Sequence, residues 1–162
     1  MLVMALLLAV AMVACGDDEG DDGAGDSTAQ ESEETEEGTE GAGEVTVVAT
    51  EYSFDLPETL PAGPVTFTLQ NEGEQPHHLI MAKLTEDAPP MEELIKMQNA
   101  DKFLEEDLTG NKPPMAKPGE TSKTSIDTEL TAGTYGYVCF IGDKVKKKPH
   151  AFLGMNGTFT VE

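Results

Sequence analysis

From residue 45 onward, short apolar stretches alternate with polar residues and end at proline or glycine. Residues 45–50 (VTVVAT), 64–71 (PVTFTLQN) and 133–140 (GTYGYVCF) are rich in β-branched and aromatic side chains. This pattern is typical of short β-strands and, without regularly alternating helices, predicts two antiparallel sheets packed as a sandwich. Tyr135 and Tyr137 are expected to pack within a sheet or to form a tyrosine corner rather than to relay electrons.

One segment departs from the strand pattern. Residues 89–108, PPMEELIKMQNADKFLEEDL, begin with two prolines and then carry apolar residues at helical spacing. This predicts one or two short helices inserted between strands. Met91, Met97 and Met115 are expected to pack the insertion against the sandwich rather than to bind metal, because methionine commonly fills gaps between packed elements.

The first 44 residues differ from the rest of the chain. Residues 16–44 hold thirteen acidic residues and no basic or aromatic residue. Such a segment cannot bury enough apolar surface to offset its ordering entropy, so we expect a disordered acidic linker. Residues 45–162 hold 18 acids and ten lysines and are expected to form one domain. The net charge of −21 excludes nucleic acid as a partner, because phosphates would be repelled.

Residues 1–15, MLVMALLLAVAMVAC, are apolar up to Cys15. The run is too short to span a bilayer but suits the apolar part of a signal peptide. Its end, MVAC, resembles the lipobox of bacterial lipoproteins, in which cleavage precedes the cysteine and the sulfur receives a diacylglycerol group. The resemblance implies that Cys15 is lipidated and that the domain is extracytoplasmic, held at the membrane by this anchor alone. The alternative is an ordinary signal peptide with a coincidental cysteine.

Cys139 is the one cysteine in residues 45–162 and therefore has no disulfide partner within the domain. An unpaired thiol in an exported protein is a metal ligand, a nucleophile or a reactive liability. His77, His78 and His150 lie in the same domain, and Met155 follows the last of them closely. A thiolate, two imidazoles and a thioether form a ligand set that suits copper in both of its oxidation states.

Three segments resemble the copper-binding segments of the cupredoxins, and of plastocyanin in particular. Residues 71–79, NEGEQPHHL, are similar to the segment in which an asparagine begins a turn and Pro-His supplies the first ligand. Residues 133–139, GTYGYVC, resemble the Gly-x-Tyr-x-aromatic-x-Cys pattern, and residues 149–157, PHAFLGMNG, the loop in which four residues separate His from Met. The resemblance implies a Greek-key sandwich that binds one type 1 copper. The ligands that it implies are His77, Cys139, His150 and Met155.

Adjacent histidines leave a choice of ligand. Because successive side chains on a strand point to opposite faces, His77 and His78 cannot both face one interior metal. Alternation alone does not settle the choice, because both faces of this strand carry apolar residues. The resemblance selects His77, which directly follows Pro76, and leaves His78 and Asn71 as candidate hydrogen-bond partners around the ligand loops.

The segment between Cys139 and His150, FIGDKVKKKP, is far longer than its plastocyanin counterpart. This segment contains a cluster of lysines close in sequence to two predicted ligands, in a domain that is otherwise acidic. Its lysines are Lys144, Lys146, Lys147 and Lys148. We predict that these lysines steer an acidic redox partner protein toward the copper, the alternative being that they only make the loop soluble.

These features predict a one-electron carrier tethered outside the cytoplasmic membrane. By its resemblance to the cupredoxins, copper would cycle between Cu(II) and Cu(I), and an exposed edge of His150 would pass the electron. The alternative is a copper-delivery protein for which the metal is cargo. An enzyme is not expected, because a Cys139 nucleophile would lack an orienting acid and an oxyanion loop. Nitrite reduction would need further histidines for a second copper, and only His78 remains.

Overall fold

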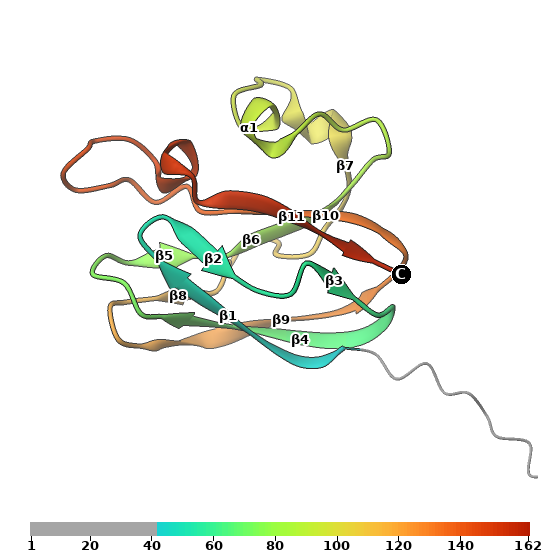
Figure 1. Ribbon diagram of the computed structural model, residues 1–162, viewed down its shortest axis with the longest axis horizontal. Helices are drawn as coiled ribbons and strands as arrows, with labels where there is room; N and C mark the ends of the chain where they lie inside the picture. The colour runs from blue at the N-terminus through green and yellow to red at the C-terminus, as the bar shows by residue number, and fades with distance from the viewer. Residues whose placement is uncertain (1–41) are drawn as a thin grey trace, which may run out of the picture. The chain divides into compact units, whose positions relative to one another are not determined.

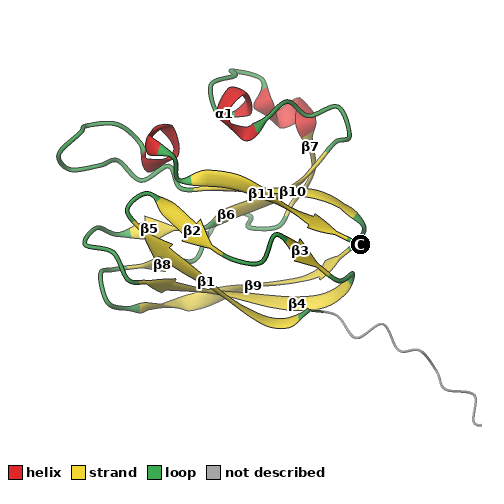
Figure 2. Ribbon diagram, viewed as in Figure 1, coloured by secondary structure: helices red, strands yellow, loops and turns green. Residues whose placement is uncertain are grey.

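The computed structural model describes residues 42–162, and these form a sandwich of two β-sheets (Figures 1 and 2). One sheet has four strands in the order β2-β1-β4-β9, and the other has five in the order β3-β11-β10-β6-β7. A separate pair, β5 and β8, lies at one end (Figure 1). The predicted all-β sandwich is therefore confirmed. The predicted signal peptide, Cys15 and the linker up to residue 41 lie outside the described residues.

The chain crosses between the sheets into and out of β3, and again between β4 and β6, between β7 and β9 and between β9 and β10, in a Greek-key arrangement. The first sheet contains β1 (Gly43–Thr50), β2 (Ser53–Asp55), β4 (Gly63–Asn71) and β9 (Thr121–Leu130). The second contains β3 (Thr59–Leu60), β6 (Ile80–Leu84), β7 (Leu104–Asp107), β10 (Gly133–Val138) and β11 (Asn156–Val161). The end pair is β5 (His77–His78) and β8 (Met115–Ala116).

Two strand pairings correct the expectation of a wholly antiparallel sandwich. β1 pairs with β4 in parallel, and β3 pairs with β11 in parallel. Parallel neighbours need a long connection between them, and each of these pairs has one. Between β1 and β4 the chain forms β2 and β3 before it returns. The alternation of apolar residues shows which face of a strand is buried, but it carries no information about the direction of the neighbouring strand.

The core lies between the two sheets and follows the alternation in the sequence. In β4, Val65, Phe67 and Leu69 are buried, whereas the residues between them are partly exposed. Tyr135 of β10 is fully buried, and its ring stacks on Phe159 with the ring centroids 5.1 Å apart. Burial of such large apolar side chains stabilises the folded state by about 1.5–3 kcal/mol each.

Tyr135 also forms the predicted tyrosine corner. Its hydroxyl group donates a hydrogen bond of 2.9 Å to the carbonyl oxygen of Thr131 and accepts one of 3.1 Å from the Thr131 N–H. The contact fixes the turn between β9 and β10, because it satisfies the buried polar end of an otherwise apolar ring. Tyr137 packs edge-on against Phe54 at 5.8 Å, which confirms a packing role for it as well.

The insertion at residues 89–108 is less helical than predicted. It contains one turn of α-helix, α1 (Met91–Leu94), and one 3₁₀ turn, η1 (Ala100–Phe103), and it ends in strand β7. Residues 104–107 become a strand because they pair with β6, whose backbone groups need partners. Within residues 42–162, no helix has the length and apolar character needed to cross a membrane.

Methionines of the insertion and of β8 differ in their packing. Met91 is buried in an apolar cluster with Leu84 and Val138, and Met97 packs against the same cluster. Both therefore have the predicted packing role. Met115 is 55% exposed, so the prediction that it packs against the sandwich is wrong. It lies in β8, where the register places it opposite His78 at the end of the molecule.

Three chain segments carry the predicted ligands to one end of the sandwich. His77 lies in β5, which follows β4, and Cys139 directly follows β10. His150 begins the 3₁₀ turn η2 (His150–Leu153), and Met155 directly precedes β11. These segments lie at the end opposite the C-terminus (left in Figure 1).

Candidate metal centre

His77, Cys139 and His150 form a buried cluster at this end, with each side chain 0% exposed. Their donor atoms converge: the two Nδ1 atoms lie 3.1 Å apart, and Cys139 Sγ lies 3.6 Å from His150 Nδ1 and 4.0 Å from His77 Nδ1. A point equidistant from the three atoms lies about 2.1 Å from each, within the range of about 2.0–2.3 Å for metal–nitrogen and metal–sulfur bonds. The residues present therefore fit a metal ion.

Backbone hydrogen bonds lock Cys139, His150 and Met155 together although the chain between them is a loop. The N–H of Cys139 donates to the carbonyl of Met155 at 3.0 Å, and the N–H of Met155 donates to that of His150 at 3.1 Å. The N–H of Ala151 donates to the carbonyl of Cys139 at 2.7 Å. Because these bonds join main-chain atoms, the spacing of the three residues does not depend on a metal.

Asn71 shapes the turn that delivers His77. Its Oδ1 accepts the N–H of Gly73 at 2.8 Å, and its Nδ2 donates to the carbonyls of Gln75 and Ala116 at 2.8 and 3.0 Å. The side chain is 1% exposed, so these contacts are needed to satisfy its polar atoms. The structure thus places Asn71 where the resemblance expected it, at the start of the turn.

Burial keeps the donors neutral in the absence of a metal. Burial raises the pKa of the Cys139 thiol, and the N–H groups of His78 and Ile141 only partly oppose this shift. Burial likewise lowers the pKa of His77 and of His150, although the nearby carboxylates act in the opposite direction. Neutral imidazoles have a free lone pair for coordination. A metal that binds here must displace the thiol proton, because thiolate is the coordinating form.

The chemistry of the donors fits one copper ion. Two imidazoles and one thiolate in a plane, with a weak thioether on the axis, form the ligand set of a blue-copper electron-transfer site. Met155 is 0% exposed and packs in the same apolar cluster as Cys139. The thiolate suits Cu(I), and the imidazoles tolerate both oxidation states.

The structure separates the two adjacent histidines. His77 Nδ1 lies in the cluster, whereas His78 Nε2 accepts the backbone N–H of Phe140 at 2.8 Å. Strand alternation explains the difference, because in β5 the side chain of His77 is buried and that of His78 is partly exposed. His78 thus ties its own strand to the residue that follows Cys139.

The expectation that His150 has an exposed edge is wrong. Its side chain is 0% exposed, and the ring of Tyr52 lies 5.4 Å from the imidazole ring. The long loop folds back over the site: Gly142 pairs with Pro149, and the N–H of His150 donates to the carbonyl of Ile141 at 2.9 Å.

Sequence reasoning did not find the carboxylates beside the cluster. Glu51 Oε1 lies 3.3 Å from His77 Nε2, and Asp143 Oδ2 lies 3.9 Å from His150 Nε2. Asp143 is 3% exposed, which is rare for an aspartate. An acidic residue is an ordinary feature of loops and turns in this chain, so no motif distinguished these two. The one weak signal is the position of Asp143 inside the ligand loop.

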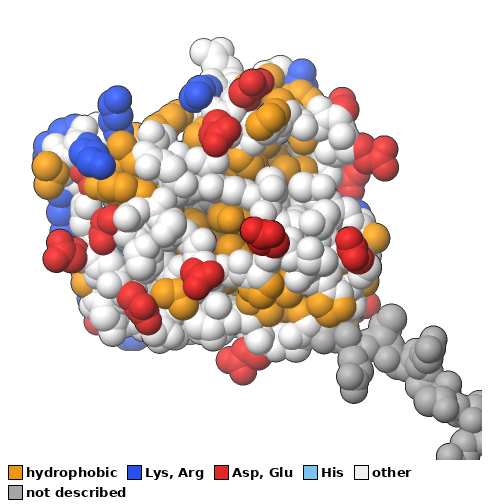
Figure 3. Space-filling view, viewed as in Figure 1, with side chains coloured by type: hydrophobic (Ala, Val, Ile, Leu, Met, Phe, Trp, Pro, Cys, Tyr) orange, Lys and Arg blue, Asp and Glu red, His pale blue; other side chains and the backbone are white. Residues whose placement is uncertain are grey.

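The predicted basic loop lies on the surface at this end of the molecule. Its lysines are exposed, and in this region Figure 3 shows blue lysine side chains next to orange hydrophobic ones (upper left). Apolar side chains are exposed in the same region of the chain: Phe140 is 43% exposed, Val145 83% and Phe152 44%. Lys146 Nζ lies 4.2 Å from the centroid of the Tyr52 ring, so this lysine also covers the residue that packs on His150.

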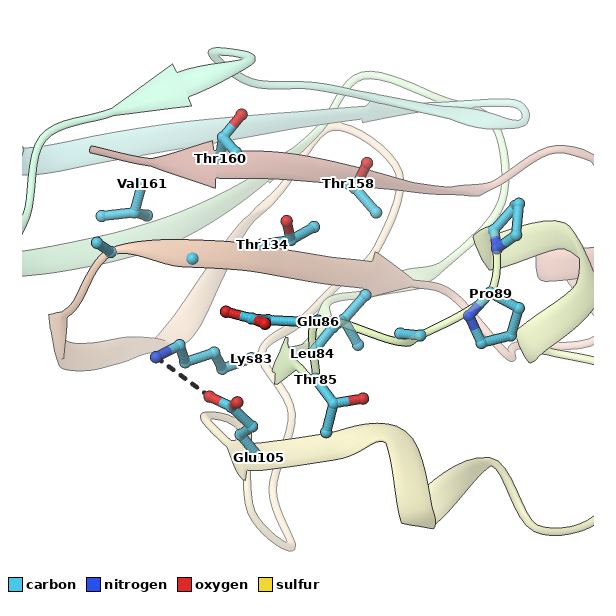
Figure 4. Close-up of a pocket in the computed structure, with 14 residues that line it drawn as sticks. Lys83, Leu84, Thr85, Glu86, Pro89, Glu105, Thr134, Thr158, Thr160 and Val161 are labelled. Carbon is cyan, nitrogen blue, oxygen red and sulfur yellow. Dashed lines mark ion pairs between the residues drawn. The ribbon is translucent and has the colours of Figure 1, made fainter.

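A surface hollow elsewhere on the domain is separate from the cluster. It lies on the outer face of the second sheet and is lined by Lys83, Thr134 and Thr158 among others (Figure 4). An ion pair of 3.2 Å joins Lys83 to Glu105 at its rim. None of the four predicted ligands lines this hollow.

No protein-family model matches the sequence, and no curated protein matches it. Among solved structures, the chain is similar to auracyanin B, with 25% identity over 75% of this chain and 90% of that one and a TM-score of 0.47. It is also similar to auracyanin A, a "blue" copper protein from Chloroflexus aurantiacus, with 25% identity over 74% and 100% of the two chains and a TM-score of 0.43. Rusticyanin from Thiobacillus ferrooxidans shows 24% identity over 74% and 77% of the chains, with a TM-score of 0.44. The described residues form a two-sheet β-sandwich with a buried His77–Cys139–His150 cluster, as the resemblance to the cupredoxins implied.

Proposed function

We propose that this protein is a one-electron carrier with one type 1 copper, which His77, Cys139, His150 and Met155 would hold. The observation that carries the proposal is the convergence of three fully buried donor atoms around one point about 2.1 Å from each. Bound copper would supply a Cu(II)/Cu(I) couple. The protein supplies the ligands, their fixed positions and the exclusion of water.

Rigidity supports electron transfer over catalysis. Main-chain hydrogen bonds join Cys139, His150 and Met155, and the turn before His77 is held by Asn71. A site whose ligands are fixed before metal binding changes little in geometry when the metal gains or loses an electron. All four proposed ligands are 0% exposed, so a substrate has no direct path to the metal. These features support a carrier rather than an enzyme.

A carrier and a copper-delivery protein differ in how they hold reduced copper. We expect the copper-loaded protein to keep its metal through repeated reduction and reoxidation in the presence of a moderate Cu(I) chelator, because the ligands are buried and locked. The visible band, followed through the cycles, should return to its full height each time. Stoichiometric transfer of Cu(I) to the chelator in the first cycle would support delivery and contradict the carrier.

Met155 is proposed to tune the potential as a weak fourth ligand. Met155→Leu should raise the reduction potential while copper remains bound, because losing a donor penalises Cu(II) more than Cu(I), which prefers lower coordination. The potential can be measured by redox titration of the visible band. Met81→Leu is a matched control, since Met81 is also buried but lies within β6 and is not a proposed ligand. Equal reduction potentials in the wild type and Met155→Leu would show that Met155 is a core residue and not a ligand.

We further propose that the domain works outside the cytoplasmic membrane, tethered through lipid on Cys15. The MVAC sequence at residues 12–15 and the acidic segment that follows support this proposal. A tether of this kind would let the domain reach partners near the membrane surface. The mass of the mature protein, purified from membranes, should show a diacylglycerol adduct on an N-terminal Cys15; an unmodified mature chain would contradict the tether.

The basic loop is proposed to guide an acidic redox partner protein. Replacing its four lysines by glutamates should slow association with an acidic electron acceptor and remove or reverse the dependence of the rate on ionic strength, because surface charges act over about 10 Å at 0.1 M salt. Stopped-flow electron transfer at several salt concentrations measures both effects. The replaced residues are Lys144, Lys146, Lys147 and Lys148. Unchanged rates and salt dependence would leave the lysines a solubilising role only.

A further inference from the structure

We propose that Glu51 and Asp143 are positioning residues for the metal centre: each carboxylate faces the outer nitrogen of one ligand histidine and holds down the reduction potential of the bound copper. The proposal rests on the proposed function, because it concerns the same site. It explains two acidic side chains, contributed by separate loops, that the ligand set by itself does not require.

The two histidines have the same arrangement. Each turns Nδ1 toward the cluster, which leaves Nε2 as the N–H that points away from it. Glu51 Oε1 lies 3.3 Å from His77 Nε2, within reach of a weak hydrogen bond. Asp143 Oδ2 lies 3.9 Å from His150 Nε2, which is too long for a hydrogen bond but close for a charge. His150 Nε2 is buried and has no hydrogen-bond partner within residues 42–162, so this carboxylate is the charge that it faces.

Glu51 is held in place by the turn that carries the first ligand. Its Oε1 accepts the backbone N–H groups of Glu74 and Gln75, both at 2.8 Å. Burial opposes the charge on Glu51, but these N–H groups and the contact with His77 outweigh it and keep the pKa of the carboxyl below its usual value. The carboxylate is therefore a fixed negative charge beside His77.

Asp143 is held more firmly still. Its Oδ2 accepts the hydroxyl of Tyr52 at 2.8 Å and the side-chain amide of Gln75 at 2.6 Å. Its Oδ1 accepts the backbone N–H groups of Val145 and Lys146. These donors, the Gln75 amide first among them, hold the pKa of Asp143 far below its usual value. A buried carboxylate with four donors has no freedom to turn away from His150.

Gln75 connects the two halves of the arrangement. Its Nε2 donates to Asp143, and its Oε1 accepts the backbone N–H of Lys144 at 2.9 Å. The turn that precedes His77 is thereby joined to the loop that precedes His150. Both carboxylates belong to one hydrogen-bonded network around the site, so the long ligand loop has a defined function: it brings Asp143 to the outer side of His150.

The effect on the metal follows from electrostatics. A negative charge close to a cation stabilises the higher charge, Cu(II), over Cu(I), and therefore lowers the reduction potential. Buried or half-buried charges are screened less by salt than exposed ones. Hydrogen-bond partners on the outer nitrogen of a ligand histidine also fix the ring orientation and raise its basicity. Both effects act in the same direction.

The test is the reduction potential of the copper-loaded protein, obtained by redox titration of its visible band. Glu51→Gln removes the charge but keeps an oxygen that accepts the N–H groups of Glu74 and Gln75. We expect it to shift the potential upward, with an unchanged copper stoichiometry and melting temperature. Asp143→Asn should also shift the potential upward. Glu51→Asp, which keeps the charge, should lie closer to the wild type than Glu51→Gln does.

Glu74→Gln is the matched control, because it removes the same charge from the same end of the molecule but from an exposed side chain. An upward shift in Glu51→Gln that exceeds the shift in Glu74→Gln supports the proposal. Equal shifts in these two variants, with the visible band intact, overturn it and leave the proposed function standing. If the wild-type protein develops no visible copper band, the proposed function fails and this inference fails with it. Glu51→Gln decides the matter even if Asp143→Asn does not fold.

Discussion

Cys139→Ser is expected to abolish the visible absorption of the copper-loaded protein completely. An intense band arises from charge transfer between a thiolate and copper, and Cys139 is the one cysteine among the described residues. Serine offers a hydroxyl group that stays protonated near neutral pH and binds copper poorly, so copper affinity should fall as well. The measurement is a titration of the purified protein with Cu(II), followed by visible spectroscopy and by metal analysis.

The fold should survive this substitution, which makes the result interpretable. Two backbone N–H groups, of His78 and Ile141, approach the sulfur of Cys139. A serine oxygen can accept them, so burying the hydroxyl leaves it with partners. Far-ultraviolet circular dichroism and the melting temperature of the metal-free variant check this point. A colourless wild type, or a band that persists in Cys139→Ser, would contradict the copper assignment.

His77→Ala is expected to remove the visible copper band, whereas His78→Ala is expected to keep it with a modest shift. His77 contributes Nδ1 to the cluster, 3.1 Å from the Nδ1 of His150, so its loss removes one of the three converging donor atoms. His78 does not contribute a donor to the cluster. Its Nε2 accepts the N–H of Phe140, the residue after Cys139. Losing that acceptor loosens the thiolate ligand without removing a donor.

Two further variants sharpen the comparison between the histidines. His78→Gln retains an oxygen that can accept the N–H of Phe140, so its spectrum should lie nearer to the wild type than that of His78→Ala. His77→Gln retains bulk in the buried site and tests whether the band loss in His77→Ala comes from misfolding. A band that survives in both His77 variants, but not in His78→Ala, would reverse the ligand assignment.

The candidate ligands could be predicted from the sequence because each lies in a short strand or close to the end of one. The unpaired Cys139, the Pro-His pair at residues 76–77 and the spacing from His150 to Met155 are local features. Strand alternation also has a fixed period, so the buried faces of β1 and β4 could be predicted from residue type. The structure places the four predicted ligands at one end, as the order of the segments implied.

Other predictions failed where a residue's environment is made by distant parts of the chain. Residues 104–107 form a strand because β6 offers an unpaired edge, although their sequence continues a helical insertion. Met115 is exposed because β8 lies at the end of the sandwich, beyond the reach of the insertion. The side chain of His150 is covered because Tyr52, which is 98 positions earlier in the chain, packs against it with its ring tilted. None of these contacts follows from a repeating pattern of residues along the sequence.

The sequence by itself therefore determined the sandwich, the buried faces of strands such as β1 and β4 and a set of candidate copper ligands, because these depend on side-chain type and on spacing over a few residues. Only the tertiary structure decided how the site is enclosed. Glu51, Gln75 and Asp143 come from three separate loops, and their charges and hydrogen bonds act on the histidines solely because the folded chain brings them within 4 Å of their partners. Electrostatic and hydrogen-bonding effects depend on distance in space, which sequence separation does not measure.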